Sequence, residues 1–146
     1  MNDEVKLPYE LKFSQDALTG LRSATLIINS GFPKQYLGEY VLKEWNYGEK
    51  LKVELEAENI RAIKLMGIQN KLADNPSDSK LKTEKERLEK QDVEALIVLQ
   101  TLTTIRKSPT KLETIEDYNA LPGRLGTLLT NIAGYLNISP DEEKKS

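Results

Sequence analysis

The apolar positions at the start of the chain alternate with other residues. Five of them occupy every second position: Val5, Leu7, Tyr9, Leu11 and Phe13. A period of two is typical of a β-strand or an extended arm, and Pro8 restricts such a strand to a sheet edge. No partner strand is evident downstream. The pattern therefore predicts a short edge strand or an extended arm over residues 1–14, lying along the helices or along another subunit.

From Asp16 the spacing changes to that of a helix. Apolar and small residues recur every three or four positions: Ala17, Leu18, Leu21, Ala24, Thr25 and Ile28. Gly31 suits the position just past a helix end, and Pro33 suits the first position of the next helix. A second stripe follows: Tyr36, Leu37, Tyr40, Val41 and Trp45. Together these features predict a helical hairpin whose corner is residues 30–33.

A third helix is predicted from Glu49 to about Leu72. Its apolar residues are expected on one face: Val53, Ala57, Ile60, Ile63 and Met66. Residues 51–56 also alternate in polarity, so a strand is an alternative there. The hairpin and this helix make up residues 15–73. The polar, turn-rich stretch 74–80 then predicts a linker.

The remaining chain predicts a C-terminal helical part over residues 81–138. Thr83 and Glu86 match a capping box, which predicts a long helix to about Lys107, although 95–104 could also be a buried strand. A short helical turn at 112–118 precedes a last helix with an apolar face: Leu125, Leu128, Leu129, Ile132 and Leu136. Residues 139–146 predict a flexible polar tail. The expected fold class is mostly α, an irregular helical bundle with an N-terminal arm or edge strand.

Composition narrows the classes of function. The 146 residues carry 21 basic and 23 acidic side chains, a net charge of −2, which provides no general attraction to nucleic acid or anionic lipid. The longest apolar run, residues 95–99, is far shorter than a membrane span. The N-terminus lacks the features of a signal peptide. We therefore expect no membrane association and a location in the cytoplasm or within a virion.

The missing residue types argue against catalysis. The chain has no cysteine and no histidine, which excludes thiol nucleophiles and removes the commonest general base and transition-metal ligand. Ser-x-x-Lys occurs at Ser77 and Ser108, but without the further motifs that serine–lysine enzymes need. A calcium-loop match at 75–86 fails because Lys80 replaces the required glycine. The sequence predicts no catalytic residue, no cofactor, no metal site and no enzyme activity.

Aromatic residues are concentrated in the segment 32–47. The five are Phe32, Tyr36, Tyr40, Trp45 and Tyr47. Nearby lysines would allow this segment to stack the bases of a single-stranded nucleic acid, but glutamates alternate with the lysines and would repel phosphate. A small core beneath the predicted hairpin and a protein-binding surface are the other two interpretations.

Two further features are candidates for contacts with a partner. Gly126, Thr130 and Gly134 form a stripe of small residues in the last helix, which would let another helix approach closely within the monomer or from a partner. Tyr9, Leu11 and Phe13 of the predicted arm would attach it to helices or to another subunit. A protein partner or a homo-oligomer is therefore expected.

The corner 29–33, followed by an aromatic helix and then by helices rich in acidic and basic residues, is similar to helical segments of tailed-phage portal and neck proteins. The resemblance covers a short part of the chain and implies a structural component of a phage or other mobile-element particle. The sequence thus predicts a non-enzymatic helical interaction or assembly module, an adaptor or structural component. The alternative is a single-stranded nucleic-acid-binding protein that uses residues 32–47.

Overall fold

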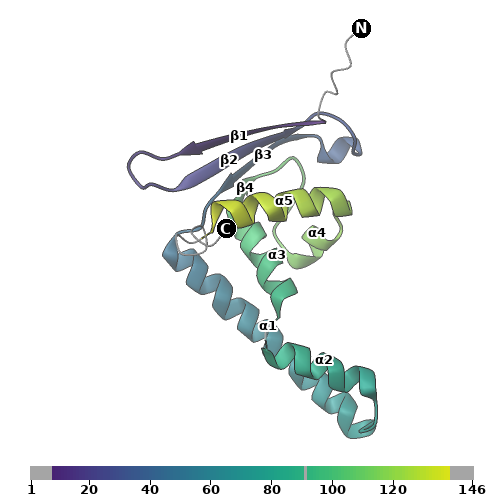
Figure 1. Cartoon of the computed structure of the whole chain (residues 1–146). Helices are drawn as coiled ribbons and strands as arrows, with labels where there is room; N and C mark the ends of the chain where they lie inside the picture. The colour runs from purple at the N-terminus through teal and green to yellow at the C-terminus, as the bar shows by residue number, and fades with distance from the viewer. Residues whose placement is uncertain (1–7, 91, 139–146) are drawn as a thin grey trace.

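The chain forms an antiparallel sheet covered by helices on one side, with a helical hairpin that projects away from this body (Figure 1). The computed structural model describes residues 8–90 and 92–138. The four strands lie in the order of the sequence: β1 Tyr9–Gln15, β2 Arg22–Ile28, β3 Gly38–Lys43 and β4 Ile105–Lys107. Half of the predicted arm, residues 1–7, and the predicted tail, 139–146, lie outside the described residues.

The helices follow β3 along the chain, except for a short 3₁₀ turn at Lys34–Tyr36 between β2 and β3. They are α1 Tyr47–Asp74, α2 Ser79–Lys90, α3 Val93–Thr104, α4 Ile115–Asn119 and α5 Gly123–Leu136. In the described part of the chain, no helix is both long enough and apolar enough to cross a membrane.

The predicted fold class is wrong. Helices make up 57% of the structure and strands 18%, with the strands gathered in one sheet at the N-terminal side, so the arrangement is α+β and not all-α. The helical hairpin predicted from residue 16 is instead β2 and β3. Because β1 pairs with β2 over residues 9–15 and 22–28, this part of the predicted arm lies within the sheet of its own chain.

A tight turn explains why residues 16–28 are not helical. The Asp16 carboxylate accepts hydrogen bonds from the backbone N–H groups of Leu18 and Thr19, at 2.8 and 3.1 Å. Gly20 has a φ of +74°, which disfavours other residues. The turn reverses the chain after β1. The following residues then alternate in burial, with Ala24, Leu26 and Ile28 inside.

The predicted helix–helix corner at 30–33 connects two strands. The N–H groups of Asn29 and Ser30 both donate to the carbonyl of Pro8, which ties the start of the corner to the residue before β1. Gly31 has a φ of +90°, as such a turn requires. The resemblance to phage portal and neck segments depends on helices at this corner, and these segments are strands.

The core lies between the sheet and α5. Across the sheet, Leu11 is opposite Leu26, and Leu26 is opposite Tyr40. Leu26 and Tyr40 are fully buried, and Leu125, Leu129 and Leu136 of α5 complete this cluster. Burial raises the pKa of Tyr40 to about 12, with a further contribution from nearby Tyr36. The predicted last helix and its apolar face are confirmed.

The predicted long helix from Thr83 to Lys107 is wrong because a break divides it into α2 and α3. The first helix begins earlier, at Ser79, where the Asp78 carboxylate accepts from the N–H groups of residues 80 and 81. Thr83 lies inside α2 and donates to the carbonyl of Ser79. Residues 105–107 form β4. The two segments for which helix and strand were alternatives, 51–56 and 95–104, are both helical. The helix predicted from Glu49 is confirmed as α1.

Candidate interaction surface

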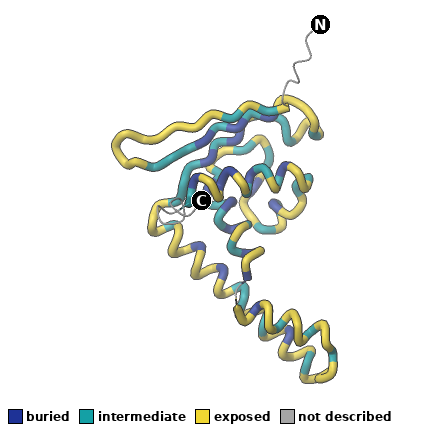
Figure 2. Tube along the Cα trace, viewed as in Figure 1, coloured by how far each residue is buried: buried dark blue, intermediate teal, exposed yellow. Residues whose placement is uncertain are grey.

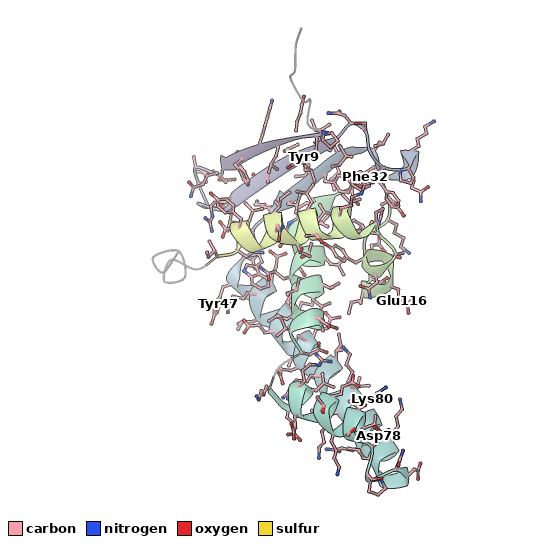
Figure 3. The ribbon with its side chains drawn as sticks, turned by 45° about the vertical axis from the view of Figure 1, so that its right-hand side comes forward. Tyr9, Phe32, Tyr47, Asp78, Lys80 and Glu116 are labelled. Carbon is pink, nitrogen blue, oxygen red and sulfur yellow. The ribbon has the colours of Figure 1, made fainter. Side chains whose placement is uncertain are left out.

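The most prominent surface feature is the projecting hairpin, which consists of α1 and α2. With 28 residues, α1 is about 42 Å long. Its first part packs on α3 and its last part on α2. Tyr47 lies at the base of the hairpin, while Asp78 and Lys80 lie near its far end (Figure 3). The hairpin therefore extends the reach of the protein well beyond the sheet.

Polar contacts hold α1 at its base. Asn46 and Glu49 form a capping box at the start of α1, each accepting from the backbone N–H of the other. Both carboxylate oxygens of Glu49 also accept from the Arg106 guanidinium, at 2.7 and 3.0 Å. The Arg106 hydrogen bonds hold the pKa of Glu49 below its usual range. A bidentate pair of this kind fixes the direction in which α1 leaves the body.

A second set of contacts, here called the clamp, joins α1 to the break between α2 and α3. The clamp consists of Arg61, Lys64 and Asp92. The Arg61 guanidinium donates to the carbonyls of Leu88 and Glu89 at 2.9 and 3.1 Å. The Lys64 ammonium lies 2.6 Å from the Asp92 carboxylate. The clamp thus binds the end of α2 and the start of α3 to one side of α1.

Asp92 is the buried member of the clamp, with a side chain that is only 1% exposed. It also caps α3 by accepting from the N–H of Ala95. Burial raises the pKa of the Asp92 carboxyl, but the hydrogen bonds from Lys64 and Ala95 and the Lys64 charge outweigh it, so the net effect lowers the pKa. Asp92 is therefore a carboxylate that the fold keeps charged.

One side of α1 is covered by the rest of the protein. Val53 and Ala57 are buried against Leu99 of α3. Farther along, Ile68 of α1 and Leu88 of α2 are buried in the hairpin. These contacts use one face of the helix, since the buried α1 residues are separated by four and eleven positions, which are close to one and three helical turns.

The opposite side of α1 carries a second row of apolar residues that nothing in the described structure covers. We call this row the outer stripe and define it as Leu51, Leu55, Ala62 and Met66. Leu51 is 50% exposed, and Leu55 and Met66 are each 64% exposed. At 100° per residue, Leu55 points about 200° away from buried Val53. Figure 2 shows exposed residues along this helix.

Sequence reasoning misses the outer stripe, because it places Ile63 and Met66 on the same face as Val53 and Ala57. That assignment is wrong, since Ile63 is 70% exposed while Val53 is 3% exposed. A signal is present in the spacing of Leu51 and Leu55, which are one helical turn apart and out of phase with Val53. It is easily passed over because one apolar face is enough to explain an ordinary amphipathic helix.

The aromatic residues at 32–47 do not form one surface. Tyr40 is fully buried in the core, and Phe32 and Tyr36 are partly buried beside it. Trp45 packs against the separate cluster around Val53, while Tyr47 is 67% exposed at the base of α1. The five aromatic residues are therefore divided among the main core, the cluster around Val53 and the surface.

The three predicted arm residues lie on β1. Tyr9 and Leu11 are partly buried against the core beneath the sheet. Phe13 is 53% exposed and packs on Tyr135 of α5, with ring centroids 5.1 Å apart. Their contacts are made to the same chain.

The small-residue stripe of α5 lies in varied surroundings. At Gly126 an added Cβ would meet the Tyr118 ring at 3.7 Å, and the Tyr118 hydroxyl donates to the Gly126 carbonyl. Burial raises the pKa of the Tyr118 hydroxyl above its usual value. Thr130 donates to the carbonyl of Thr127 in its own helix. Gly134 is exposed, with open space where a Cβ would be. A continuous close contact along the stripe is absent within the described chain.

These surroundings give a testable result for Gly134. We expect Gly134→Ala to raise the free energy of unfolding by about 0.5–1 kcal/mol, because alanine loses less backbone entropy in a helix and meets no neighbour. Chemical denaturation measures the change. Gly126→Ala is the matched control and should gain less, because its Cβ contacts the Tyr118 ring. A loss of stability in Gly134→Ala would show that this part of α5 is covered.

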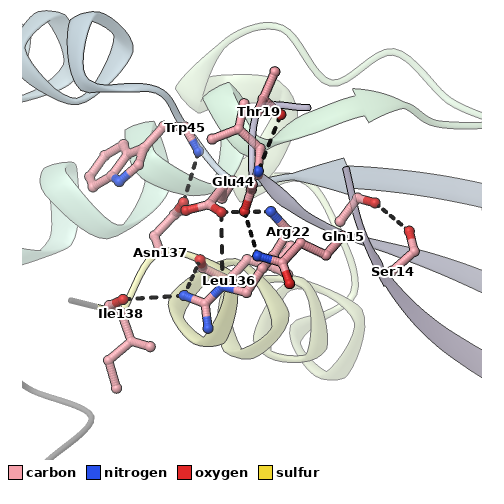
Figure 4. Close-up of polar contacts among 12 residues, drawn as sticks. Ser14, Gln15, Thr19, Arg22, Glu44, Trp45, Leu136, Asn137 and Ile138 are labelled. Atoms are coloured by element: carbon pink, nitrogen blue, oxygen red, sulfur yellow. Dashed lines mark hydrogen bonds and ion pairs between the residues drawn. The ribbon is translucent and has the colours of Figure 1, made fainter. Parts of the chain in front are cut away.

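A polar cluster around Arg22 joins β2 to the end of α5 (Figure 4). The Arg22 guanidinium donates to the carbonyls of Leu136 and Ile138 at 2.8 and 3.2 Å. The Glu44 carboxylate accepts from the Arg22 backbone N–H at 2.6 Å. The Asn137 side chain accepts from the backbone N–H of Trp45 and donates to the hydroxyl of Thr104. Leu136 is the last residue of α5, so the cluster satisfies a carbonyl that lacks a partner within the helix.

We expect Arg22→Met to lower the free energy of unfolding by roughly 1–3 kcal/mol, because it removes a charged donor to the carbonyl of the last residue of α5 and to that of Ile138 just beyond it. Urea denaturation measures the loss. Lys12→Met, on exposed β1, is the control and should change stability by less than about 0.5 kcal/mol. Equal effects of the two variants would contradict a role of Arg22 in capping α5.

The described residues contain no group of three or more acidic side chains placed to bind a metal ion. A depression beside the clamp is lined by Glu54, Glu58 and Asp92, together with two apolar residues. Each of these carboxylates is already paired: Glu54 with Lys50, Glu58 with Arg61, and Asp92 with Lys64. Two of these ion pairs lie within α1, and the Lys64–Asp92 pair joins α1 to the start of α3, so the carboxylates that line the depression already have cationic partners.

Comparison with known proteins finds no matching family model, no matching curated protein and no matching solved structure.

Proposed function

We propose that this protein is a non-enzymatic interaction module that binds another protein chain through the outer stripe of α1. The supporting observation is that α1 carries two apolar faces, while the described part of its own chain covers only one. An exposed row of apolar residues on a projecting element is typical of a protein-binding site, and here the row is interrupted at its centre by Glu58 and Asn59. The clamp and the Arg106–Glu49 pair hold the row in a fixed direction, which reduces the entropy lost on binding.

A helix is the segment of a partner that suits this row best. Residues of the outer stripe are spaced by four or seven positions, so they lie along one side of α1. An amphipathic helix of a partner could cover such a row with its own apolar face. The body of the protein, with its sheet and α5, would then serve as the support from which the hairpin projects.

Nucleic-acid binding is less well supported. A stacking platform needs several aromatic faces on one surface, and the segment 32–47 buries Tyr40 completely. The base of α1 is also acidic, since four glutamates and two lysines occupy residues 47–60. Phosphate would be repelled there.

Site-specific photocrosslinking tests the proposal. A benzophenone amino acid in place of Ile63, beside the outer stripe, should form an adduct with a protein chain when irradiated in the cells that make this protein. Leu55→Asp in the same chain should abolish the adduct, because a carboxylate in an apolar contact is costly. The control places the same amino acid at Glu86, on the charged side of α2.

Adducts that are equally strong at positions 63 and 86, or that persist with Leu55→Asp, would contradict the proposal. An adduct whose added mass disappears on nuclease treatment would favour nucleic acid instead. Circular dichroism of Leu55→Asp should remain unchanged, because Leu55 is 64% exposed in the isolated chain.

A further inference from the structure

We infer that the partner of the outer stripe is a second copy of this chain, whose α1 lies antiparallel to the first. The inference rests on the proposed function, because it names the occupant of the same surface. Three observations support it: the spacing of residues in the stripe, the sizes of the residues that would meet, and the distribution of charge along the hairpin.

The spacing of residues in the stripe is the same in both directions. Its members are separated by four, seven and four positions, so the row is symmetric about a point between Glu58 and Asn59. A twofold axis through that point would place Leu51 opposite Met66 of the second copy, and Leu55 opposite Ala62. In a twofold interface each contact occurs twice, so a self-complementary row of this kind is what such an interface requires.

The residue sizes suit this register. Leu55 would meet the small Ala62 near the centre, and a large residue opposite a small one lets two helices interdigitate at close range. At the two ends, the γ-branched side chain of Leu51 and the unbranched side chain of Met66 would cover each other. Ile63, which is 70% exposed beside the stripe, would lose solvent contact in the same assembly.

Charge selects the antiparallel direction. Residues 47–60 at the base carry four glutamates and two lysines, a net charge of −2. Residues 61–90, which include the tip, carry eight basic and five acidic side chains, a net charge of +3. An antiparallel pair in this register places residues 61–70 of each copy, which hold Arg61 and Lys64 and no acidic residue, beside residues 47–56 of the other, which have a net charge of −1. A parallel pair would bring like charges together, which costs energy and disfavours that arrangement.

The absence of cysteine in this chain permits a direct test of the register. Leu51→Cys and Met66→Cys proteins are purified separately, mixed, and oxidised with copper–phenanthroline. The mixture should form a disulfide-linked dimer several-fold more than either protein alone. In the antiparallel register two copies of residue 51 are about 22 Å apart along the axis, which is beyond the reach of a disulfide. Efficient dimer formation by Leu51→Cys alone would indicate a parallel pair and overturn the inference.

Light scattering across a range of concentrations tests the assembly itself. The unmodified chain should approach twice its mass of 16.5 kDa as concentration rises. Leu55→Asp should weaken the dimer roughly hundredfold, because each copy loses an apolar contact of about 1.4 kcal/mol and the substitution occurs twice. Leu18→Asp, at a leucine that is 96% exposed in the β1–β2 turn, should leave the mass unchanged.

A chain that stays monomeric up to millimolar concentration would overturn the inference, as would a dimer lost with Leu18→Asp and kept with Leu55→Asp. The proposed function, binding of a protein chain at the outer stripe, can hold even where this inference fails. If the chain is monomeric and the Ile63 photocrosslink still captures a different protein in a Leu55-dependent way, the surface binds another chain and only the choice of a second copy fails. If both experiments are negative, both proposals fail.

Discussion

Replacing Leu129 by alanine should lower the free energy of unfolding by about 2–5 kcal/mol. Leu129 is completely buried in the middle of α5, where it packs in the cluster formed with β2 and β3. Alanine would leave a cavity that neither a rigid sheet nor a helix held by the Arg22 cluster can close. The expected loss therefore combines the smaller buried apolar surface with the weaker van der Waals attraction among the side chains that line the cavity.

Urea denaturation followed by circular dichroism measures this effect, and the slope of the transition should be unchanged. Leu18→Ala is the matched control because Leu18 is 96% exposed; its effect should be within about 0.5 kcal/mol. A loss below about 1 kcal/mol at Leu129 would mean that α5 does not pack on the sheet as described.

Removing the Asp92 carboxylate should have the second largest effect. We expect Asp92→Ala to lower the free energy of unfolding at neutral pH by roughly 2–3 kcal/mol, because it removes the cap of α3 and leaves Lys64 without its partner. Asp92→Asn retains a capping side chain and removes only the charge, so its loss should be smaller. The difference between the two variants separates the cap from the ion pair.

The effect of Asp92→Asn should depend on pH in a defined direction. Because the folded-state pKa of Asp92 is lowered, its charge contributes stability above the unfolded pKa of about 3.9. That contribution is lost as the pH falls through the folded pKa. The stability difference between the original chain and Asp92→Asn should therefore be full at pH 7 and decrease below about pH 4. A difference that grows towards low pH would contradict a charged Asp92.

The clamp also determines the position of the hairpin relative to the body. With Asp92→Ala, hydrogen exchange should accelerate in α2 and at the start of α3 more than in the sheet. The reason is local: α2 is held mainly by Arg61, Leu88 and the loop that joins it to α1. Uniform acceleration throughout the chain would instead indicate that the hairpin and the body unfold as one unit.

Helical segments with strong local signals could be predicted from the sequence. The last helix has five apolar residues in helical phase and no competing pattern, and the helix from Glu49 has a long helix-favouring composition between two turn signals. Both are confirmed as α5 and α1. The alternation at Tyr9, Leu11 and Phe13 indicated an extended segment, and β1 is extended. These features depend on residues close together in the chain.

The partner of β1 could not be identified in this way. Residues 16–28 fit a helical spacing, but the alternation of Ala24, Leu26 and Ile28 fits a strand as well, and a short window contains both. The choice was made by contacts distant in sequence: β1 and β3 supply hydrogen bonds on either side, and α5, about a hundred residues later, covers the buried face. A helix there would leave β1 without a partner strand and β3 paired only with the short strand β4.

The sequence by itself determined the general chemistry, with no cysteine, no histidine and nearly balanced charge, and it predicted two of the helices, α1 and α5. Only the tertiary structure decided that the N-terminal third is a sheet, that Asp92 divides one predicted helix into two, and that α1 has a covered and an uncovered side. The hydrophobic periodicity of a sequence shows which residues are apolar. Which part of the protein covers each of them depends on the tertiary packing. Leu55 and Val53 are both apolar residues of one helix, and only the position of α3 made one buried and the other exposed.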